Sequence, residues 1–158
     1  MKNLKRGLIL FIALVFSGGL GAYAQAPSAV AKAMSELEKK YEDTDGVMCV
    51  TLTKGSGLGM MKMMLNQELG KSFMKGVTSI TFVEYSEASV QVRKALKEDI
   101  GVITAQLEEF DRGEKKESAQ GYANMSNADS GKISDFIIII EDDETNMVMY
   151  MAGDIVVK

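Results

Sequence analysis

The last quarter of the chain contains two strongly β-prone segments separated by a short acidic turn. Residues 136–140 read FIIII, and the methionines in residues 147–151 alternate with a valine and a tyrosine. Such runs of β-branched, aromatic and alternating residues are typical of strands. The polar residues 142–145 between them predict a turn, so strands over 133–141 and 146–157 should pair antiparallel. Any fold for this chain has to include a sheet that contains this hairpin.

The preceding part of the chain predicts an alternation of helices and strands. Ser28 is placed to cap the first helix, in which Val30, Met34 and Leu37 recur at helical spacing. Upstream of residue 106 we expect a helix over 29–41, a strand over 47–53, a glycine-rich link over 54–59, a helix over 58–75, a strand over 77–85 and a helix over 87–103.

Apolar spacing also predicts which side chains of these elements are buried. The first strand should direct Met48, Val50 and Leu52 toward the core. In the second helix the repeating apolar residues are Leu58, Met61, Leu65, Leu69 and Phe73, and in the third they are Val90, Leu96 and Ile100.

Short candidate strands follow from about residue 106. They cover 106–112 and 117–125, with polar turns over 113–116 and 127–131, and they lead into the closing hairpin. The expected fold class is α+β, with a mainly antiparallel sheet of about four to six strands and helices packed on one face. No internal repeat, linker or low-complexity tract divides residues 25–158, so we expect a single domain.

The N-terminus has the pattern of a secretory signal peptide. Lys2, Lys5 and Arg6 precede an apolar run over 8–16, and small residues end at Ala24. This predicts a signal peptide over 1–24 and an exported, soluble product that is periplasmic or secreted. The apolar run is shorter than the roughly 20 residues that span a membrane. A lipoprotein needs a Cys at the cleavage point, and the only Cys is residue 49, so we expect no lipid anchor.

Charge and residue types exclude several classes of function. The 158 residues contain no His, one Cys, 18 basic and 22 acidic residues. Without residues 1–24, which hold three basic and no acidic residues, 15 basic residues oppose 22 acidic ones and the net charge is −7. Such a chain repels nucleic acid and anionic lipid. Imidazole ligands, Ser-His or Cys-His catalysis and an intrachain disulfide are excluded. Cys49 could cross-link two chains but is more simply a small apolar strand residue.

Two segments of the sequence invite a ligand hypothesis. Residues 55–59 (GSGLG) lie between a strand and a helix, as a phosphate-binding loop does, but Met60 occupies the position of the third glycine and no Gly-Lys-Ser/Thr follows. We interpret them as a flexible connection. Methionines cluster at 60, 61, 63 and 64, with Met74 and the 147–151 stripe, and thioethers bind copper(I). Core packing is the favoured interpretation, and copper binding and an exposed interaction surface remain alternatives.

Carboxylates offer two further hypotheses. Residues 141–144 (EDDE), with Thr145 and Asn146, carry oxygen ligands suited to calcium but lack the alternation and central glycine of an EF-hand loop, so a solvated turn is favoured. Glu84, Glu108 and Asp111 are candidates for paired-carboxylate hydrolysis, although nothing in their spacing singles them out. No catalytic, cofactor-binding or metal-binding residue is therefore assigned, and no cofactor is expected.

The order of the elements resembles the exported bacterial domain-of-unknown-function family numbered 4252. The resemblance rests on the segments 37–54 (LEKKYEDTDGVMCVTLTK), 71–84 (KSFMKGVTSITFVE) and 131–155 (GKISDFIIIIEDDETNMVMYMAGDI), together with the exported N-terminus. It implies no established activity and no functional residues. Some members look like lipoproteins, and this chain departs from them because it lacks the necessary Cys.

The sequence thus favours a non-enzymatic cell-envelope domain that binds a protein or an apolar ligand through the helices on its sheet. A methionine-based copper(I)-handling protein is the first alternative, and a small carboxylate hydrolase is the second. The partner and the oligomeric state do not follow from the sequence.

Overall fold

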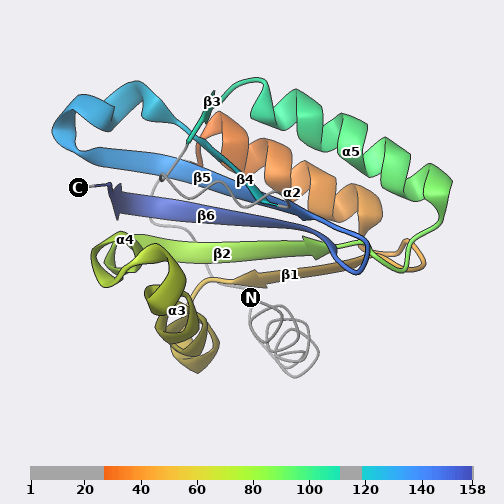
Figure 1. Ribbon diagram of the computed structural model, residues 1–158, viewed down its shortest axis with the longest axis horizontal. Coiled ribbons are helices and arrows are strands. Elements are labelled where there is room, and N and C mark those ends of the chain that lie inside the picture. Colours follow the sequence, from red (N-terminus) through yellow and green to blue (C-terminus); the bar gives the residue numbers. More distant parts are fainter. Residues whose placement is uncertain (1–26, 111–118, 158) are drawn as a thin grey trace.

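The computed structural model describes residues 27–110 and 119–157, which form a six-stranded antiparallel sheet with helices on it (Figure 1). Across the sheet the strand order is β1-β2-β6-β5-β4-β3. The strands are β1 (Met48–Leu52), β2 (Val77–Glu84), β3 (Glu108–Glu109), β4 (Ala119–Ala123), β5 (Lys132–Glu141) and β6 (Asn146–Val156). The helices are α2 (Ala29–Tyr41), α3 (Gly55–Leu69), α4 (Lys71–Lys75), α5 (Val90–Thr104) and the 3-10 helix η1 (Met125–Ser130). The predicted α+β class with an antiparallel sheet is confirmed.

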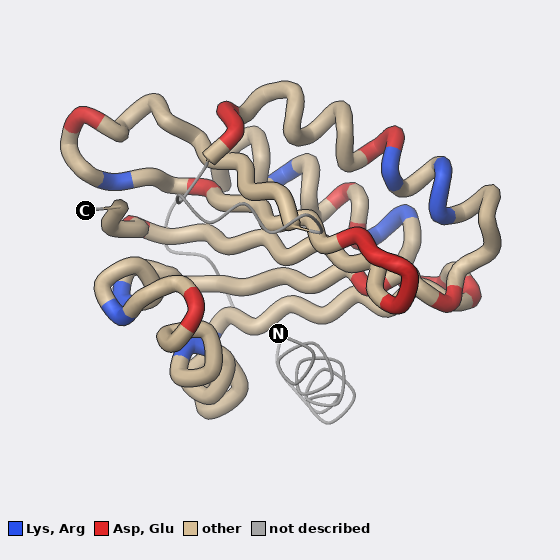
Figure 2. The backbone as a smooth tube through the Cα atoms, in the orientation of Figure 1, with Lys and Arg blue, Asp and Glu red and all other residues tan. Residues whose placement is uncertain are grey.

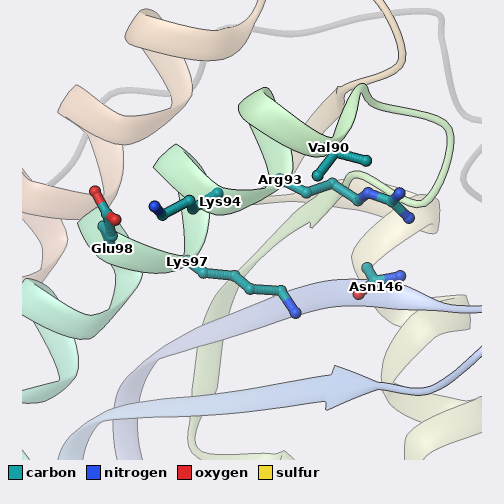
Figure 3. Close-up of a pocket in the computed structure, with 6 residues that line it drawn as sticks. All are labelled: Val90, Arg93, Lys94, Lys97, Glu98 and Asn146. Carbon is teal, nitrogen blue, oxygen red and sulfur yellow. The ribbon is translucent and has the colours of Figure 1, made fainter.

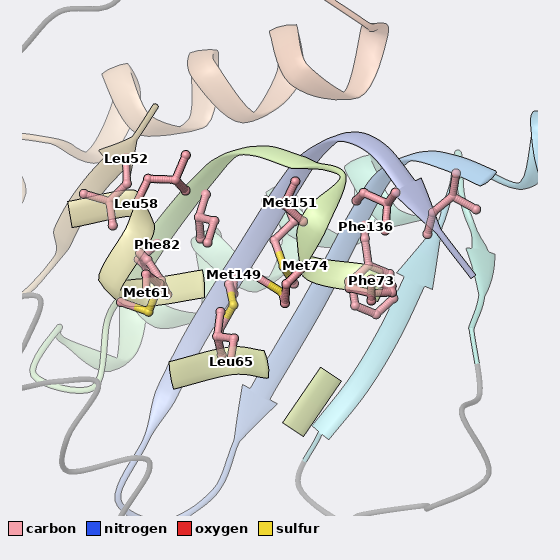
Figure 4. Close-up of a cluster of buried hydrophobic side chains, with 14 of the residues drawn as sticks. Leu52, Leu58, Met61, Leu65, Phe73, Met74, Phe82, Phe136, Met149 and Met151 are labelled. Carbon is pink, nitrogen blue, oxygen red and sulfur yellow. The ribbon is translucent and has the colours of Figure 1, made fainter. Parts of the chain in front are cut away.

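Helices cover both faces of the sheet, and each face has its own core. On one face α3 and α4 pack on the alternating methionines of β6, with Met61 beside Phe82 and Leu65 beside Met149 (Figure 4). On the other face α2 and α5 lie side by side and pack on the residues between those methionines (Figure 1). The second core contains Val30, Met34, Leu37, Tyr41, Val83, Tyr85, Ala88, Leu96, Ile100, Ile103, Ile137, Val148 and Tyr150.

The expectation that helices would pack on one face only is therefore corrected. The physical reason lies in the closing hairpin, because both sets of alternating side chains in β5 and β6 are apolar. Met147, Met149 and Met151 face the α3 core, whereas Val148 and Tyr150 face the α2–α5 core. A strand that is apolar on both sides needs cover on both sides.

The predicted first helix is confirmed as α2. The hydroxyl of Ser28 accepts a hydrogen bond from the backbone N–H of Ala31 at 3.0 Å, as an N-cap does. Val30, Met34 and Leu37 are buried on its inner face, and Tyr41 extends that face.

The predicted helix over 58–75 is two helices in the structure. Gly70 has φ +89°, a conformation that favours glycine, and it separates α3 from α4. α3 also begins earlier than predicted, at Gly55, so residues 55–59 lie in the helix instead of forming a link. Its inner face is close to the prediction, since Leu58, Met61 and Leu65 are buried.

The predicted third helix is α5, and one residue of its proposed buried stripe is wrong. Leu96 and Ile100 are buried, but Val90 is 72% exposed. Ser89 is the N-cap, because its hydroxyl accepts from the N–H of Val92 at 3.3 Å. Val90 is therefore the first residue of the helix and lies beyond the part of α5 that packs on the sheet.

The described residues after α5 hold less strand than predicted. Only Glu108–Glu109 and Ala119–Ala123 are strands there, and residues 111–118, which include Asp111 and the predicted turn over 113–116, lie outside the described residues. The predicted turn over 127–131 is mostly the helix η1, which Gly131 ends with φ +74°. Both strands of the closing hairpin are confirmed, as β5 and β6.

None of the helices within residues 27–110 and 119–157 combines the length and the hydrophobicity of a membrane-spanning segment.

Candidate binding surface

One edge of the sheet, formed by β1, has backbone groups that the rest of the described chain does not pair. The backbone N–H of Tyr85 donates to the carbonyl of Asn146 in β6 at 2.9 Å. Partners alternate along an antiparallel strand, so the even-numbered residues of 80–84 direct their backbone groups to β1. It follows that Cys49 and Thr51 direct theirs away from the sheet. We call this outer side of Met48–Leu52 the open edge.

The open edge lacks the features that usually block strand pairing. β1 reads MCVTL, with no charge and no proline, whereas charged residues, prolines and bulges are the common protection of edge strands. The strand at the opposite end of the sheet, β3, is two residues long and consists of Glu108 and Glu109. Among the described strands, β1 is thus the edge suited to accept another strand.

The two sides of the open edge differ in chemistry. On the α3 side, Met48 and Val50 are half-buried and pack against the first core. On the α2 side, the hydroxyl of Thr51 donates to the Glu38 carboxylate at 2.5 Å. Glu42, the C-cap of α2, lies close enough to act on both Glu38 and Cys49. One side of the edge is apolar, and the other is acidic.

The titration of the α2 side reflects this crowding of carboxylates. Burial raises the pKa of Glu38, the hydrogen bond from Thr51 opposes that rise, and the charge of Glu42 adds to it. Burial, with the charges of Glu38 and Glu42, raises the pKa of the Cys49 thiol to about 12. Cys49 is therefore protonated at neutral pH, which makes it a poor nucleophile and a poor metal ligand.

The outer face of α3 is uncharged and carries two exposed methionines. Met60 and Met63 are 51% and 69% exposed and, three residues apart, lie on the same face of the helix. Figure 2 shows that most of the α3 tube carries no charge. Lys62 turns inward, where its ammonium donates to the carbonyl of Val77 at 2.7 Å, and desolvation lowers its pKa. We call Met60 and Met63, with exposed Ser56, Gly59 and Gln67, the methionine face.

The methionine face and the open edge lie on elements that follow one another in the chain and share a core. Only Thr53 and Lys54 separate the end of β1 from the start of α3. Leu52 of β1 and Leu58 of α3 lie beside each other in the first core (Figure 4). A partner that reaches one of the two surfaces is therefore close to the other.

A family model described as "Domain of unknown function (DUF4252)" matches residues 41–158. The chain belongs to the DUF4252 family. The resemblance that the sequence indicated is thereby confirmed. Comparisons with curated proteins and with solved structures find no match. The DUF4252 match begins at the last residue of α2, so it contains every strand of the described sheet, including β1.

A second surface feature of this DUF4252 chain is an open groove of about 450 Å³ beside α5 (Figure 3). Arg93, Lys94 and Lys97 line it together with Glu98. Lys97 already pairs with Glu141 at 3.1 Å, and the acidic turn over 142–144 follows directly. The groove is therefore lined by charges of both signs, Glu98 among them, and one of its cations is already paired.

A buried carboxylate lies on the α2 side of the sheet. Asp135 is 1% exposed and accepts hydrogen bonds from the hydroxyls of Ser28 at 2.6 Å, Ser134 at 2.7 Å and Tyr150 at 2.7 Å. The Asn124 side chain adds a longer one at 3.4 Å. Because Ser28 is the N-cap of α2, Asp135 fixes the start of that helix to the sheet. The side chain is fully engaged and enclosed, which indicates a structural role.

The methionines singled out from the sequence differ in exposure, and Met64 is half-buried. Met61, Met74, Met147, Met149 and Met151 are buried in the α3 core, whereas Met60 and Met63 are exposed. The 60–64 cluster therefore does not point in one direction. The phosphate-loop hypothesis for residues 55–59 is wrong, because they form the first turns of α3.

The carboxylates considered for catalysis do not converge. Glu84 is buried on β2 and accepts from the N–H of Ser86, whereas Glu108 is exposed on β3. Four strand spacings separate β2 from β3, about 19 Å, which exceeds the separation that paired-carboxylate hydrolysis uses. Asp111 lies outside the described residues.

The acidic run over 141–144 begins at the last residue of β5 and continues into the turn before β6. Glu141 pairs with Lys97 and accepts from the Tyr85 hydroxyl at 3.1 Å, and Asp142 accepts from the N–H groups of Glu144 and Thr145. Within the described residues no group of three or more Asp, Glu, Cys or His side chains is placed to hold a metal.

Sequence reasoning missed the open edge and its acidic side. Nothing in the letters MCVTL says whether that strand is central or terminal in a sheet. The helical position of Glu38 and Glu42 beside β1 likewise depends on how α2 packs. The sequence does contain one signal for the acidic side of the edge. Residues 42–45 (EDTD) come shortly before the uncharged strand, so acidic residues lie close to apolar ones in the chain.

Proposed function

We propose that this chain is an exported, non-enzymatic domain of the cell envelope whose role is to bind a protein partner. The observation that carries the proposal is the juxtaposition of the open edge with the methionine face. Methionine side chains are flexible and polarisable, and they are frequent at surfaces that adapt to a partner. An unprotected strand edge adds backbone hydrogen bonds to such a surface.

Export is supported by the basic, apolar and small-residue segments over 1–24. A non-enzymatic role is supported by the absence of His from the sequence and by the protonated state of the only Cys. The separation of Glu84 from Glu108 also weighs against the hydrolase alternative.

The test is native mass spectrometry of the protein purified gently from the envelope fraction of its host. We expect a chain that starts at Gln25 and carries a stoichiometric protein partner. Met63→Lys should abolish the partner mass, because a charge at the centre of the methionine face would be desolvated on binding. Val102→Lys is the matched control, since Val102 on α5 is 68% exposed, close to the 69% of Met63, and should keep the partner.

Other outcomes would contradict the proposal. A bound copper ion that disappears in a Met60→Leu, Met63→Leu double variant would favour the copper(I) alternative. A bare monomer in every preparation would exclude a stably bound partner. Equal loss in the Met63→Lys and Val102→Lys variants would show that the methionine face is not the binding surface.

A further inference from the structure

A strand added at the open edge would meet two chemically different sides. Side chains alternate between the two faces of a strand, so every second residue of an added strand would lie on the α3 side of the sheet and the others on the α2 side. The outward backbone groups of Cys49 and Thr51 would supply hydrogen bonds to its main chain. The residues on each side of the sheet then determine which side chains of the added strand are preferred on that side.

The α2 side selects positive charge. Glu38 and Glu42 flank the edge there, and the carbonyl end of α2, which carries partial negative charge, lies next to them. Lys40 does not neutralise this group, because its ammonium pairs with Asp99 on α5 at 2.6 Å. Within residues 27–110 and 119–157 no lysine or arginine pairs with Glu38 or Glu42, so the basic side chains of a partner could bind these carboxylates.

The α3 side selects apolar side chains. Met48 and Val50 are half-buried, so apolar surface remains accessible beside the edge. Covering it removes apolar surface from water, which favours association. No charged residue of β1 opposes this contact.

We propose that the open edge binds an extended segment of a partner protein in which basic and apolar side chains alternate. The segment pairs with β1 as an added strand, with its basic side chains toward Glu38 and Glu42 and its apolar side chains toward Met48 and Val50. This inference rests on the proposed binding function and specifies the chemistry of the partner.

A second copy of the chain fits this edge poorly. Antiparallel pairing of two β1 strands in one continuous sheet places the α2 helices of both copies on the same side. Glu38 and Glu42 of one copy would then face those of the other, and β1 has no basic residue to separate them. Like charges opposed across a strand pair are destabilising.

The experiment uses the protein purified from its host and a fluorescent eight-residue probe of alternating lysine and valine, held at low concentration to prevent self-association. Binding is followed by anisotropy, and amide hydrogen exchange at Cys49 and Thr51 is followed in parallel. A block peptide of the same composition, with four lysines followed by four valines, is the control. We expect the alternating probe to bind at least about tenfold more tightly and to protect both amides.

A pair of matched variants tests the charge. Glu42→Lys should weaken binding of the alternating probe about tenfold, because an attractive charge beside the edge becomes repulsive. Glu36→Lys makes the same charge change at another exposed position of α2, and we expect at most a twofold effect. Both positions are exposed, so both variants should fold.

The proposal is overturned if the block peptide binds equally well, or if Glu36→Lys weakens binding as much as Glu42→Lys, because attraction to an acidic protein would then explain the result. Protection of Cys49 and Thr51 without any probe, together with a dimer in sedimentation analysis, would assign the edge to a second copy. A third outcome separates this inference from the proposed function. If the probe does not bind, but the native partner is present and is lost in Met63→Lys, the inference is refuted and the proposed function stands.

Discussion

Asp135 shows how one residue positions a whole helix. Its carboxylate is buried at 1% exposure and receives hydroxyl hydrogen bonds from Ser28, Ser134 and Tyr150. Ser28 in turn caps α2, so the positive end of the α2 dipole lies near the negative charge. Among the described residues the donors to Asp135 are hydroxyl and amide groups, and no lysine or arginine takes part. Sequence patterns predicted the cap but not its partner, which lies 107 residues away.

Replacing this carboxylate tests its structural role. Asp135→Ala should lower the free energy of unfolding by about 3 kcal/mol, because buried donors lose a charged acceptor. Asp129→Ala, at an exposed position of η1, should change it by less than about 0.5 kcal/mol. Urea unfolding curves measure both, and an Asp135→Ala variant as stable as the Asp129→Ala control would contradict the assignment.

At the scale of elements, glycines mark where the backbone approaches itself. A Cβ at Gly76, between α4 and β2, would lie 1.9 Å from the carbonyl oxygen of Asp154. Gly153 lies opposite in β6, with φ +151° and a similar conflict with the carbonyl of Gly76. The register of β2 against β6 shifts at this point, between Val77 and Ser79. Composition does not distinguish these glycines from those in open space.

Alanine substitutions at a crowded glycine and at an open one should therefore change the free energy of unfolding in opposite directions. Gly76→Ala should destabilise the fold by more than about 2 kcal/mol, because backbone atoms must move to admit the methyl group. Gly101→Ala should stabilise it by about 0.5–1 kcal/mol, since Gly101 is interior to α5 and its Cβ meets nothing within 4 Å. Thermal unfolding of the two variants measures the difference, and a Gly76→Ala variant that is as stable as the unsubstituted protein would show that the close approach is absent.

At the scale of the whole molecule, one sheet separates two hydrophobic cores. Ile80 belongs to the α3 core and Ile137 to the α2–α5 core, and both are fully buried. Their strands, β2 and β5, are separated by β6. Both cores share the same strands. Loss of the sheet would therefore expose the apolar faces of both helical layers to water.

This arrangement predicts that the protein unfolds in a single cooperative transition. It also predicts that the two cores contribute independently to the free energy of unfolding. Ile80→Val and Ile137→Val should each cost about 1 kcal/mol, and the double variant should cost their sum within about 0.5 kcal/mol. Circular dichroism and tyrosine fluorescence during urea unfolding should give coincident curves. Separate transitions for the two probes would instead show that the layers unfold independently.

Local pattern determined much of this protein. The cap at Ser28, the inner faces of α2 and α3, and the closing hairpin follow from periods of 3.6 and 2 residues, which depend only on neighbours in the chain. The signal-like segment over 1–24 and the family resemblance are also properties of the sequence alone. Helix cover on both faces was predictable in principle, because β5 and β6 are apolar on both sides.

Only the tertiary structure decided that β1 is an edge strand, that Glu38 and Glu42 flank it, and that Met60 and Met63 face outward while Met61 is buried. These features depend on strand order and helix placement, which join residues distant in sequence through packing. A strand's own residues do not encode its position in the sheet, since central and edge strands use the same backbone pattern. The candidate binding surface is therefore a product of topology, built from residues whose local roles are ordinary.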